Sequence, residues 1–393
     1  MSNLLSIYIH LPFCRTRCGY CDFNTYAGYD HLRDSYVNAL VKEISLVSKE
    51  IKDSEIIHTI YFGGGTPSLF LPRQLEKIIT CIRGNFHCIS RIEISTEANP
   101  TCLTEGYLKS LKGLGINRLS LGMQSASDDD LKILGRKHTF LDVCKSVESA
   151  RKAGFLNINL DLIFGIPLQT QEAFEDSLKS AMGLSPDHLS LYALSVEDST
   201  PLAKQISNGE LQVPDDDLAA DMYISAMELL NSRGYSQYEI SNWARVEEAQ
   251  CLHNLQYWRN LEYLGFGAGA HSHYKHTRWE NLRKITDYID SVAKNPGIDC
   301  ISPAAANFIS LSDKDEMSET MMMGMRLTEE GISAQDFLER FGVQLGIIYS
   351  KEITKLQKRE LVEWIIKNDQ QRLRLTQKGR LLGNQVFLEF IRE

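Results

Sequence analysis

Two kinds of segment alternate along the first 245 residues of the chain. Short runs rich in β-branched and aromatic residues, such as SIYIHLPF and HTIYFGGG, are followed by longer segments in which apolar residues recur every three or four positions. The first kind is typical of buried strands and the second of amphipathic helices. Six such pairs follow one another, and glycine ends several of the helical segments. Repeated βα units predict an α/β fold with a parallel sheet, which six units would curl into a partial (β/α)6 barrel.

Near residue 300 this alternation stops. The segments EMSETMMMGMRL, AQDFLERFG and QLGIIYSKEITKLQKREL favour helices, and WIIKNDQQRLRLTQKGRLL favours a hairpin followed by a last helix. We therefore expect a partial barrel over residues 1–245, a connecting segment over 246–300, and a mostly helical, winged-helix-like domain over 301–393.

The charge balance limits the class of partner. The chain has 42 Lys and Arg against 51 Asp and Glu, a formal net charge of −9, and no stretch gathers the basic residues that bind a phosphate backbone. We therefore expect no nucleic acid partner. The sequence shows neither a signal peptide nor a run of about 18 apolar residues, which predicts a soluble, cytoplasmic protein. Nine cysteines in such a chain indicate reduced thiols rather than a disulfide framework.

Three of these cysteines stand close together in HLPFCRTRCGYCDFN, on a short loop after the first predicted strand. Cys14, Cys18 and Cys21 have a C-x3-C-x2-C spacing. A disulfide would leave one thiol over. A Cys3His zinc site with His10 is chemically sensible, although structural zinc ligands usually come as two separated pairs. The remaining alternative is a cubane iron–sulfur cluster, in which three thiolates leave one iron open for another ligand.

The spacing of the three cysteines resembles the signature of the radical S-adenosylmethionine (SAM) superfamily. That resemblance implies a 4Fe-4S cluster on Cys14, Cys18 and Cys21, whose open iron is chelated by the amino and carboxylate groups of SAM. It also implies one-electron cleavage of SAM to a deoxyadenosyl radical, and a partial barrel whose open side admits a large substrate. Active residues of βα barrels lie at the carboxyl ends of strands, so polar residues at these ends should meet at one rim.

Several predicted strands end in residues that suit SAM: GGGTP after the second strand, Glu97 in the third, Gln124 in the fourth and Asp161 in the fifth. Each alone is an ordinary strand end, but carboxylates and an amide at one rim can accept hydrogen bonds from ribose hydroxyls. The wider set resembles the oxygen-independent coproporphyrinogen III oxidase family and, within it, the radical SAM haem chaperones. This resemblance implies SAM contacts at Tyr8, Gly64, Gly65, Thr66, Glu97, Gln124, Arg136 and Asp161, with Tyr20 beside the cluster.

Two features distinguish the oxidases from the chaperones. The oxidases carry a fourth cysteine two residues after the third, where this sequence has Phe23, which counts against porphyrinogen decarboxylation. The segment CLHNLQYW resembles the H-N-x-x-Y-W signature of the haem chaperones through His253, Asn254, Tyr257 and Trp258. Neutral imidazole binds haem iron, and flat aromatic groups cover an apolar macrocycle. The alternative is a core histidine with two packed aromatic residues, which composition alone favours.

On this resemblance we expect a haem chaperone that binds haem non-covalently, with His253, Tyr257 and Trp258 as haem contacts, and hands it to haem proteins. The alternative function is that of an oxygen-independent coproporphyrinogen III oxidase, and a zinc-stabilised scaffold remains if the three cysteines bind no iron. The expected cofactors are a 4Fe-4S cluster and SAM, with haem as cargo. The expected partners are haem and acceptor haem proteins, among them respiratory enzymes at the membrane, with homodimer formation left open.

Overall fold

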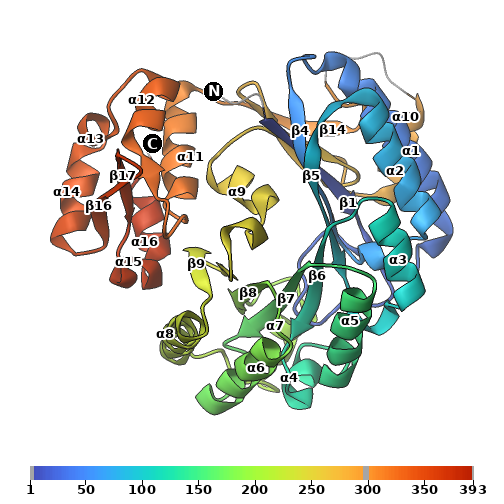
Figure 1. Cartoon of the computed structure of the whole chain (residues 1–393), viewed down its shortest axis with the longest axis horizontal. Helices are drawn as coiled ribbons and strands as arrows, with labels where there is room; N and C mark the ends of the chain where they lie inside the picture. The colour runs from blue at the N-terminus through green and yellow to red at the C-terminus, as the bar shows by residue number, and fades with distance from the viewer. Residues whose placement is uncertain (1–3, 295–300, 392–393) are drawn as a thin grey trace.

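Six parallel strands form the centre of a large sheet in the computed structural model, which describes residues 4–294 and 301–391 (Figure 1). These strands neighbour one another in chain order, as expected for consecutive βα units. The predicted α/β fold with a partial (β/α)6 barrel is confirmed. The six strands are β1 (Leu4–Leu11), β4 (Ile56–Gly64), β5 (His87–Ala98), β6 (Arg118–Gln124), β7 (Asn157–Phe164) and β8 (His188–Ala193).

Helices cover the outer face of this sheet (Figure 1). Several begin at a threonine: Thr104, Thr139 and Thr170 each accept a hydrogen bond from the backbone N–H three residues later. Such caps satisfy a donor that the helix leaves free, and so they fix where each helix starts. The helices of this part are α1 (Arg33–Val47), α2 (Pro72–Asn85), α3 (Glu105–Gly113), α4 (Asp128–Ile133), α5 (Phe140–Lys152), α6 (Gln171–Gly183), α7 (Pro201–Ser207) and α8 (Asp216–Ser232).

The sheet extends beyond the six central strands at both edges. Beyond β8 come the antiparallel strands β10 (Asn242–Ala244) and β9 (Ser236–Glu239). At the other edge the chain returns to β1, which pairs in parallel with β11 (Tyr263–Phe266). The segment over 246–300, which we expected to carry the haem signature and to connect the two domains, therefore also widens the sheet. Its described part continues with β12 (His271–Tyr274), β13 (Thr277–Asn281) and α10 (Ile285–Lys294), and β14 (Ala305–Ser310) pairs with β13 at the outer edge.

A smaller domain follows, with a hydrophobic core of its own that includes Met321, Phe337 and Phe390. Its three strands have the order β15-β17-β16, and the hairpin of β16 and β17 lies where the sequence predicts it. No helix within the described ranges is long and apolar enough to cross a membrane. The elements are α11 (Asp313–Gly324), β15 (Ile332–Ser333), α12 (Ala334–Phe341), α13 (Leu345–Ile348), α14 (Ser350–Lys358), β16 (Val362–Lys367), β17 (Gln370–Leu375), α15 (Gln377–Leu381) and α16 (Gly383–Leu388).

Between the sheet and this domain lies α9 (Leu252–Trp258), which contacts β4 on one side and α11 on the other (Figure 1). It packs on the inner face of the sheet, which is polar. Successive residues of a strand point to opposite faces, and here the outer face carries the apolar core while the inner face carries a hydrogen-bonded network. Its members include Ser6, Thr59, Tyr61, Glu97, Ser120, Asn159, Asp161 and His188.

Candidate cofactor site at the rim of the sheet

The three cysteines lie on one loop after β1, which we call the cluster loop (residues 14–21). All three are half-buried and free. Cys14 ends the two-residue strand β2 (Phe13–Cys14), and Cys21 N–H donates to the Cys18 carbonyl at 3.3 Å. Burial raises the pKa of both Cys14 and Cys21, and the charges of the other thiols raise it further. Thiolates crowded in this way need a cation among them to stay deprotonated, so the loop suits a metal.

The residues around the cluster loop distinguish between a single zinc ion and an iron–sulfur cluster. In the described part of the chain, no set of three or more His, Cys, Asp or Glu side chains converges on a point where a single ion could bind. His10, the fourth ligand of the zinc alternative, has both ring nitrogens engaged, with the Tyr8 hydroxyl at 3.0 Å and the Asn24 carbonyl at 2.9 Å. A cubane cluster offers each thiolate a different iron, so its ligands need not converge. Because His10 is already engaged, the loop offers three thiolates rather than the four ligands of a structural zinc site, and three thiolates suit a cluster with one open iron.

The glycine motif at the end of β4 lies directly against the cluster loop. Thr66 donates its hydroxyl to Cys14 Sγ at 3.6 Å, and its backbone N–H donates to the Phe13 carbonyl at 2.9 Å. A Cβ atom at Gly64 would collide with the His10 ring, and one at Gly65 would lie 2.6 Å from the Phe13 carbonyl oxygen. Only glycine fits at these two positions, because the bare backbone lets the end of β4 pack directly against His10 and the start of the cluster loop.

Two half-buried carboxyl groups, Glu97 and Asp161, lie near this motif. Glu97 accepts hydrogen bonds from the Tyr61 hydroxyl and the Gly64 N–H, both at 3.1 Å. Burial and, after it, the charge of Asp161 raise the pKa of Glu97 to about 7. Burial also raises the pKa of Asp161, although this carboxyl accepts hydrogen bonds from Ser120 and Asn159. Two neighbouring, half-buried carboxyl groups attract hydroxyl donors and positive charge, which the ribose and the sulfonium of SAM would supply.

Arg136 joins the cluster loop to the rim. Its Nη1 donates to Cys18 Sγ at 3.4 Å and its Nη2 to the Gly122 carbonyl at 2.7 Å. Gln124, at the end of β6, has a φ of 66°, a left-handed conformation that costs energy for a residue other than glycine. Burial raises the pKa of Tyr20, whose nearest charges are those of Arg136 and the cysteines. The rim thus brings together the residues that the sequence assigns to SAM.

The helix with the haem signature lies below the rim, against the inner face of β4. His253 is only 1% exposed. Its Nδ1 is 2.8 Å from Thr59 Oγ1 and its Nε2 is 2.9 Å from the Tyr257 hydroxyl, while its ring stacks on Tyr61 with the centroids 5.1 Å apart. Burial, with the charges of His58 and Arg118, lowers the pKa of His253 to about 3. The imidazole is therefore neutral and fully hydrogen-bonded in the interior.

The rest of this signature points toward the C-terminal domain. Trp258 is half-buried, its Nε1 has no hydrogen-bond partner within the described residues, and Arg326 stacks on its ring. Asn254 is half-buried as well. Cys251, just before the helix, is fully buried, and burial raises the pKa of its thiol to about 12, so it is a poor source of thiolate. The signature thus begins with His253 against the inner face of the sheet and ends with Trp258 beside Arg326 of the C-terminal domain.

Sequence reasoning missed the polar groups that hold this helix in place. Glu93 of β5 accepts hydrogen bonds from the N–H groups of Leu252 and His253, at 3.0 and 3.1 Å. Buried Arg118 compensates the charge of Glu93. A signal was present, because parallel strands buried on both faces are normally apolar throughout. In β5, by contrast, polar residues recur at every second position from Glu93 to Glu97.

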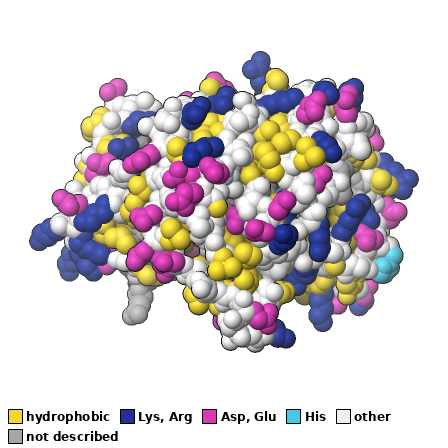
Figure 2. All heavy atoms as spheres, turned by 90° about the horizontal axis from the view of Figure 1, so that it is seen from below, with side chains coloured by type: hydrophobic (Ala, Val, Ile, Leu, Met, Phe, Trp, Pro, Cys, Tyr) yellow, Lys and Arg dark blue, Asp and Glu magenta, His cyan; other side chains and the backbone are white. Residues whose placement is uncertain are grey.

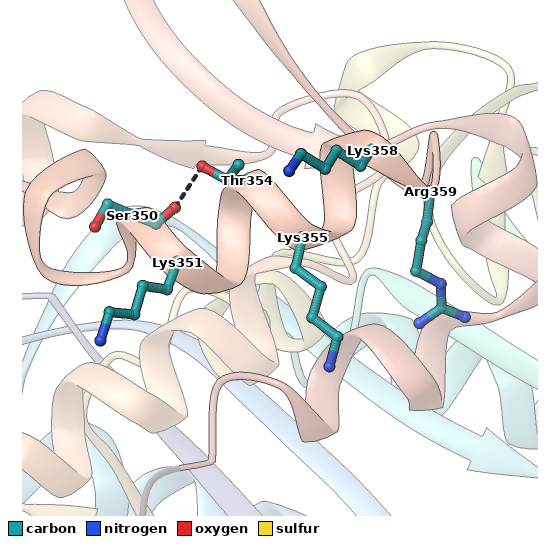
Figure 3. Close-up of a pocket in the computed structure, with 6 residues that line it drawn as sticks. All are labelled: Ser350, Lys351, Thr354, Lys355, Lys358 and Arg359. Carbon is teal, nitrogen blue, oxygen red and sulfur yellow. Dashed lines mark hydrogen bonds between the residues drawn. The ribbon is translucent and has the colours of Figure 1, made fainter.

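Elsewhere the surface mixes charges of both signs. Figure 2 shows acidic, basic and apolar side chains interspersed, with a group of Lys and Arg side chains at the end formed by the C-terminal domain. An open hollow of about 640 Å³ runs along α14 (Figure 3). None of the residues assigned to a site from the sequence lies there. Its lining residues are Ser350, Lys351, Thr354, Lys355, Lys358 and Arg359.

Family models match both the part of the chain that forms the rim and the C-terminal domain. The family model of the radical SAM superfamily matches residues 8–181, and that of the HemN C-terminal domain matches residues 311–382. The solved structure of coproporphyrinogen III oxidase (HemN) from Escherichia coli is similar with a TM-score of 0.83, over 98% of this chain and 89% of that chain, at 24% identity. At that identity the likeness shows a shared fold.

Curated relatives match along nearly the whole length. A protein of Bacillus subtilis named heme chaperone HemW is 38% identical over 99% of both chains. A protein of the same name from Lactococcus lactis is 36% identical, over 98% of this chain and 97% of that protein. The chain therefore belongs to the heme chaperone HemW family of the radical SAM superfamily.

Proposed function

We propose that the chain binds haem non-covalently and transfers it to haem proteins, while the cluster loop holds a 4Fe-4S cluster and the rim holds SAM. The observation that carries this proposal is the similarity, over 99% of both chains, to the Bacillus subtilis protein named heme chaperone HemW. Phe23 supports the same choice, because it stands where the oxidases carry a fourth cysteine and its side chain is 69% exposed. That acceptors include respiratory enzymes at the membrane, and that the chain forms a homodimer, remain predictions.

The donor groups at the rim support the cofactor part of the proposal. Cys14, Cys18 and Cys21 would bind three irons of the cluster, and Arg136 would stabilise the charge on Cys18. Bound SAM supplies a sulfonium that one electron can cleave. Glu97 and Asp161 would accept hydrogen bonds from its ribose hydroxyls. The remaining contacts proposed for SAM are Tyr8, Gly64, Gly65, Thr66 and Gln124, with Tyr20 beside the cluster.

For haem we propose contacts at His253, Tyr257 and Trp258. Neutral imidazole is the form that binds iron, and burial keeps His253 neutral. Both of its nitrogens are already hydrogen-bonded, to Thr59 and Tyr257, so axial ligation requires one of these bonds to break. Ligation by His253 therefore requires its ring to move out of the inner face, and the haem spectrum of a variant can test this.

Anaerobic reconstitution of the cluster, followed by haem titration and transfer on one sample, tests the function. We expect the full chain to bind haem, to deliver it to an apo-haem protein, and to give no decarboxylation product from coproporphyrinogen with reductant and SAM present. Formation of that product would favour the oxidase instead. Failure to bind haem would overturn the carrier function.

Variants of the signature test the ligand. His253→Ala should change the haem absorption spectrum and slow delivery, whereas His271→Ala should not, because His271 is exposed and lies outside the signature. Cys251→Ala tests the neighbouring thiol, whose thiolate spectrum differs from that of imidazole. If His253→Ala leaves both spectrum and delivery unchanged, His253 is an ordinary core residue and haem binds elsewhere.

A further inference from the structure

A small cavity lies between the edge of the large sheet and the C-terminal domain. Its volume is about 280 Å³, and none of the residues assigned to the rim lines it. The chain after α11 runs beside β9 here, because Ile240 N–H donates to the Arg326 carbonyl and Thr328 N–H to the Tyr238 carbonyl, both at 3.1 Å. The walls come from both domains and include Ile240, Arg326, Arg380, Leu382, Asn384 and Phe387.

The guanidinium of Arg326 makes no ion pair with any residue that the structure describes. It lies between two aromatic rings, with Cζ 5.1 Å from the ring centroid of Trp258 and 4.6 Å from that of Phe387. Its Nε is buried and has no hydrogen-bond partner among the described residues. Stacking satisfies the faces of a guanidinium but leaves the donors along its edge free. Arg326 is therefore held in place with its hydrogen-bonding edge unused.

Arg380 brings a second guanidinium to the same cavity. Its Nη1 donates to Gln237 Oε1 at 2.8 Å, but its Nε is buried without a partner in the described ranges. Burial lowers the pKa of both arginines. Glu239, the carboxyl whose charge acts on Arg326, instead accepts hydrogen bonds from the Ser241 N–H and the Asn242 side chain, and burial raises its pKa to about 7. The cavity therefore has two half-buried cations, each with a buried Nε that lacks an acceptor among the described residues, and an anion that entered would supply one.

We propose that this cavity binds a carboxylate, held by the guanidinium groups of Arg326 and Arg380. A guanidinium donates two parallel hydrogen bonds to a carboxylate, and this match is the reason arginine is favoured at such sites. The volume of about 280 Å³ suits a short acidic side chain or a small free acid rather than a whole macrocycle.

A propionate of haem is the source of the carboxylate that we favour. Trp258, one of the proposed haem contacts, forms one side of the stack that holds Arg326. A macrocycle near Trp258 would place its acidic arms within reach of the cavity. This choice of source rests on the proposed haem function, whereas the carboxylate site itself rests on the two arginines.

The cations along α14 provide a matched control (Figure 3). Lys351 and Lys358 are exposed to solvent, and Lys355 pairs with Glu389 at 2.7 Å. Solvated lysines bind anions weakly, because water competes and the flexible side chains must be ordered. Lys358→Gln removes one positive charge from the same domain without touching the cavity.

The test compares haem, haem dimethyl ester and succinate as ligands of the cluster-loaded full chain. The proteins are wild type, Arg326→Gln, Arg380→Gln and Lys358→Gln, with thermal unfolding as a check that each variant folds. Esterification should weaken haem binding to wild type and Lys358→Gln by roughly 10- to 100-fold, the loss expected for a charged hydrogen-bonded pair. In Arg326→Gln and Arg380→Gln, haem and its ester should bind almost equally. Succinate should compete with haem only in wild type and Lys358→Gln.

Other outcomes separate this inference from the proposed function. The comparison of haem with its ester on wild type needs no variant, so a poorly folded variant leaves the test intact. Equal binding of haem and ester, together with equal succinate binding by all four proteins, would overturn the carboxylate site. Succinate binding that is lost in the two arginine variants, without any effect of esterification, would support the site and overturn the propionate as its source. If wild type binds no haem, the haem function fails and the succinate measurements alone decide the site.

Discussion

Replacing His253 by glutamine should remove part of the pH dependence of the protein's stability. Glutamine is close in size to histidine and can still donate to and accept from Thr59 and Tyr257, but it does not titrate. The folded-state pKa of His253 is lowered to about 3, whereas an imidazole in the unfolded chain titrates near 6.5. The unfolded state therefore binds a proton first as the pH falls. The stability that neutral His253 contributes is complete above pH 6.5 and is lost progressively as the pH drops toward 3.

The size of the effect follows from the two pKa values. Each unit of difference corresponds to about 1.4 kcal/mol, so the full contribution, which is lost once the pH is well below 3, is about 5 kcal/mol. Between pH 7.5 and pH 5.5, a range that a folded protein tolerates more easily, the loss is about 1.4 kcal/mol. Other buried histidines, such as His10 and His188, titrate in both proteins, so their contributions cancel when the variant is compared with wild type.

Urea unfolding at pH 7.5 and pH 5.5 measures this difference. On lowering the pH, wild type should lose about 1.4 kcal/mol more than His253→Gln does. His31→Gln, the same substitution at an exposed position, is the control for the exchange itself. Identical pH dependence in wild type and His253→Gln would mean that His253 is accessible to protons in the folded protein, and the buried, doubly hydrogen-bonded geometry would be refuted.

Replacing Cys14, Cys18 or Cys21 by alanine should abolish the bound iron, the bound sulfide and the EPR signal of the reduced protein. Cys81→Ala is the control and should keep all three. Iron retained in a variant of the cluster loop would contradict the assignment of the cluster. Glu97→Gln and Asp161→Asn should each weaken SAM binding in calorimetry by about 1 to 3 kcal/mol, because a ribose hydroxyl loses its charged acceptor. Since Glu97 titrates near pH 7 and its ionised form is the better acceptor, SAM affinity should rise about tenfold from pH 6 to pH 8 in wild type but not in Glu97→Gln. A pH profile shared by both proteins would exclude Glu97 from the SAM site.

The repeated units and the rim could be predicted from the sequence because both depend on local order. Strand and helix periods are visible within ten to twenty residues, and in parallel strands the carboxyl ends meet at one rim whatever the details. The sequence alone was therefore enough to predict that Glu97, Gln124 and Asp161 lie at the same rim. The contact of Thr66 with Cys14 follows from the same logic, since the two residues come shortly after the ends of the neighbouring strands β4 and β1.

Contacts between distant segments could not be predicted in this way. β11 pairs with β1 across more than two hundred residues, and its short GFGAGA surroundings carry turn signals rather than a strand pattern. The signature around His253 predicts a helix but not the face of the sheet that it covers, because helical periodicity says nothing of the partner. Arg326 gave no signal, since its stacking on Trp258 and Phe387 arises only when the two domains pack together.

Glu93 provides a last test, because one strand carries both Glu97, which we propose as a SAM contact, and the group that accepts hydrogen bonds from the start of α9. Glu97 reaches the rim, and Glu93, four residues earlier, accepts hydrogen bonds from two N–H groups at the start of α9. If Glu93 is ionised, Glu93→Gln replaces two charge-assisted hydrogen bonds at the start of α9 by neutral ones and removes one of the charges near buried Arg118, and it should cost about 2 to 3 kcal/mol of unfolding free energy. Thr104→Ala, which removes an ordinary helix cap, should cost about 1 kcal/mol. Urea unfolding measures the loss of stability in both variants. A loss in Glu93→Gln no greater than that in Thr104→Ala would show that Glu93 is protonated in the folded protein, in line with the raised pKa of its carboxyl group. Neutral hydrogen bonds alone would then hold the helix.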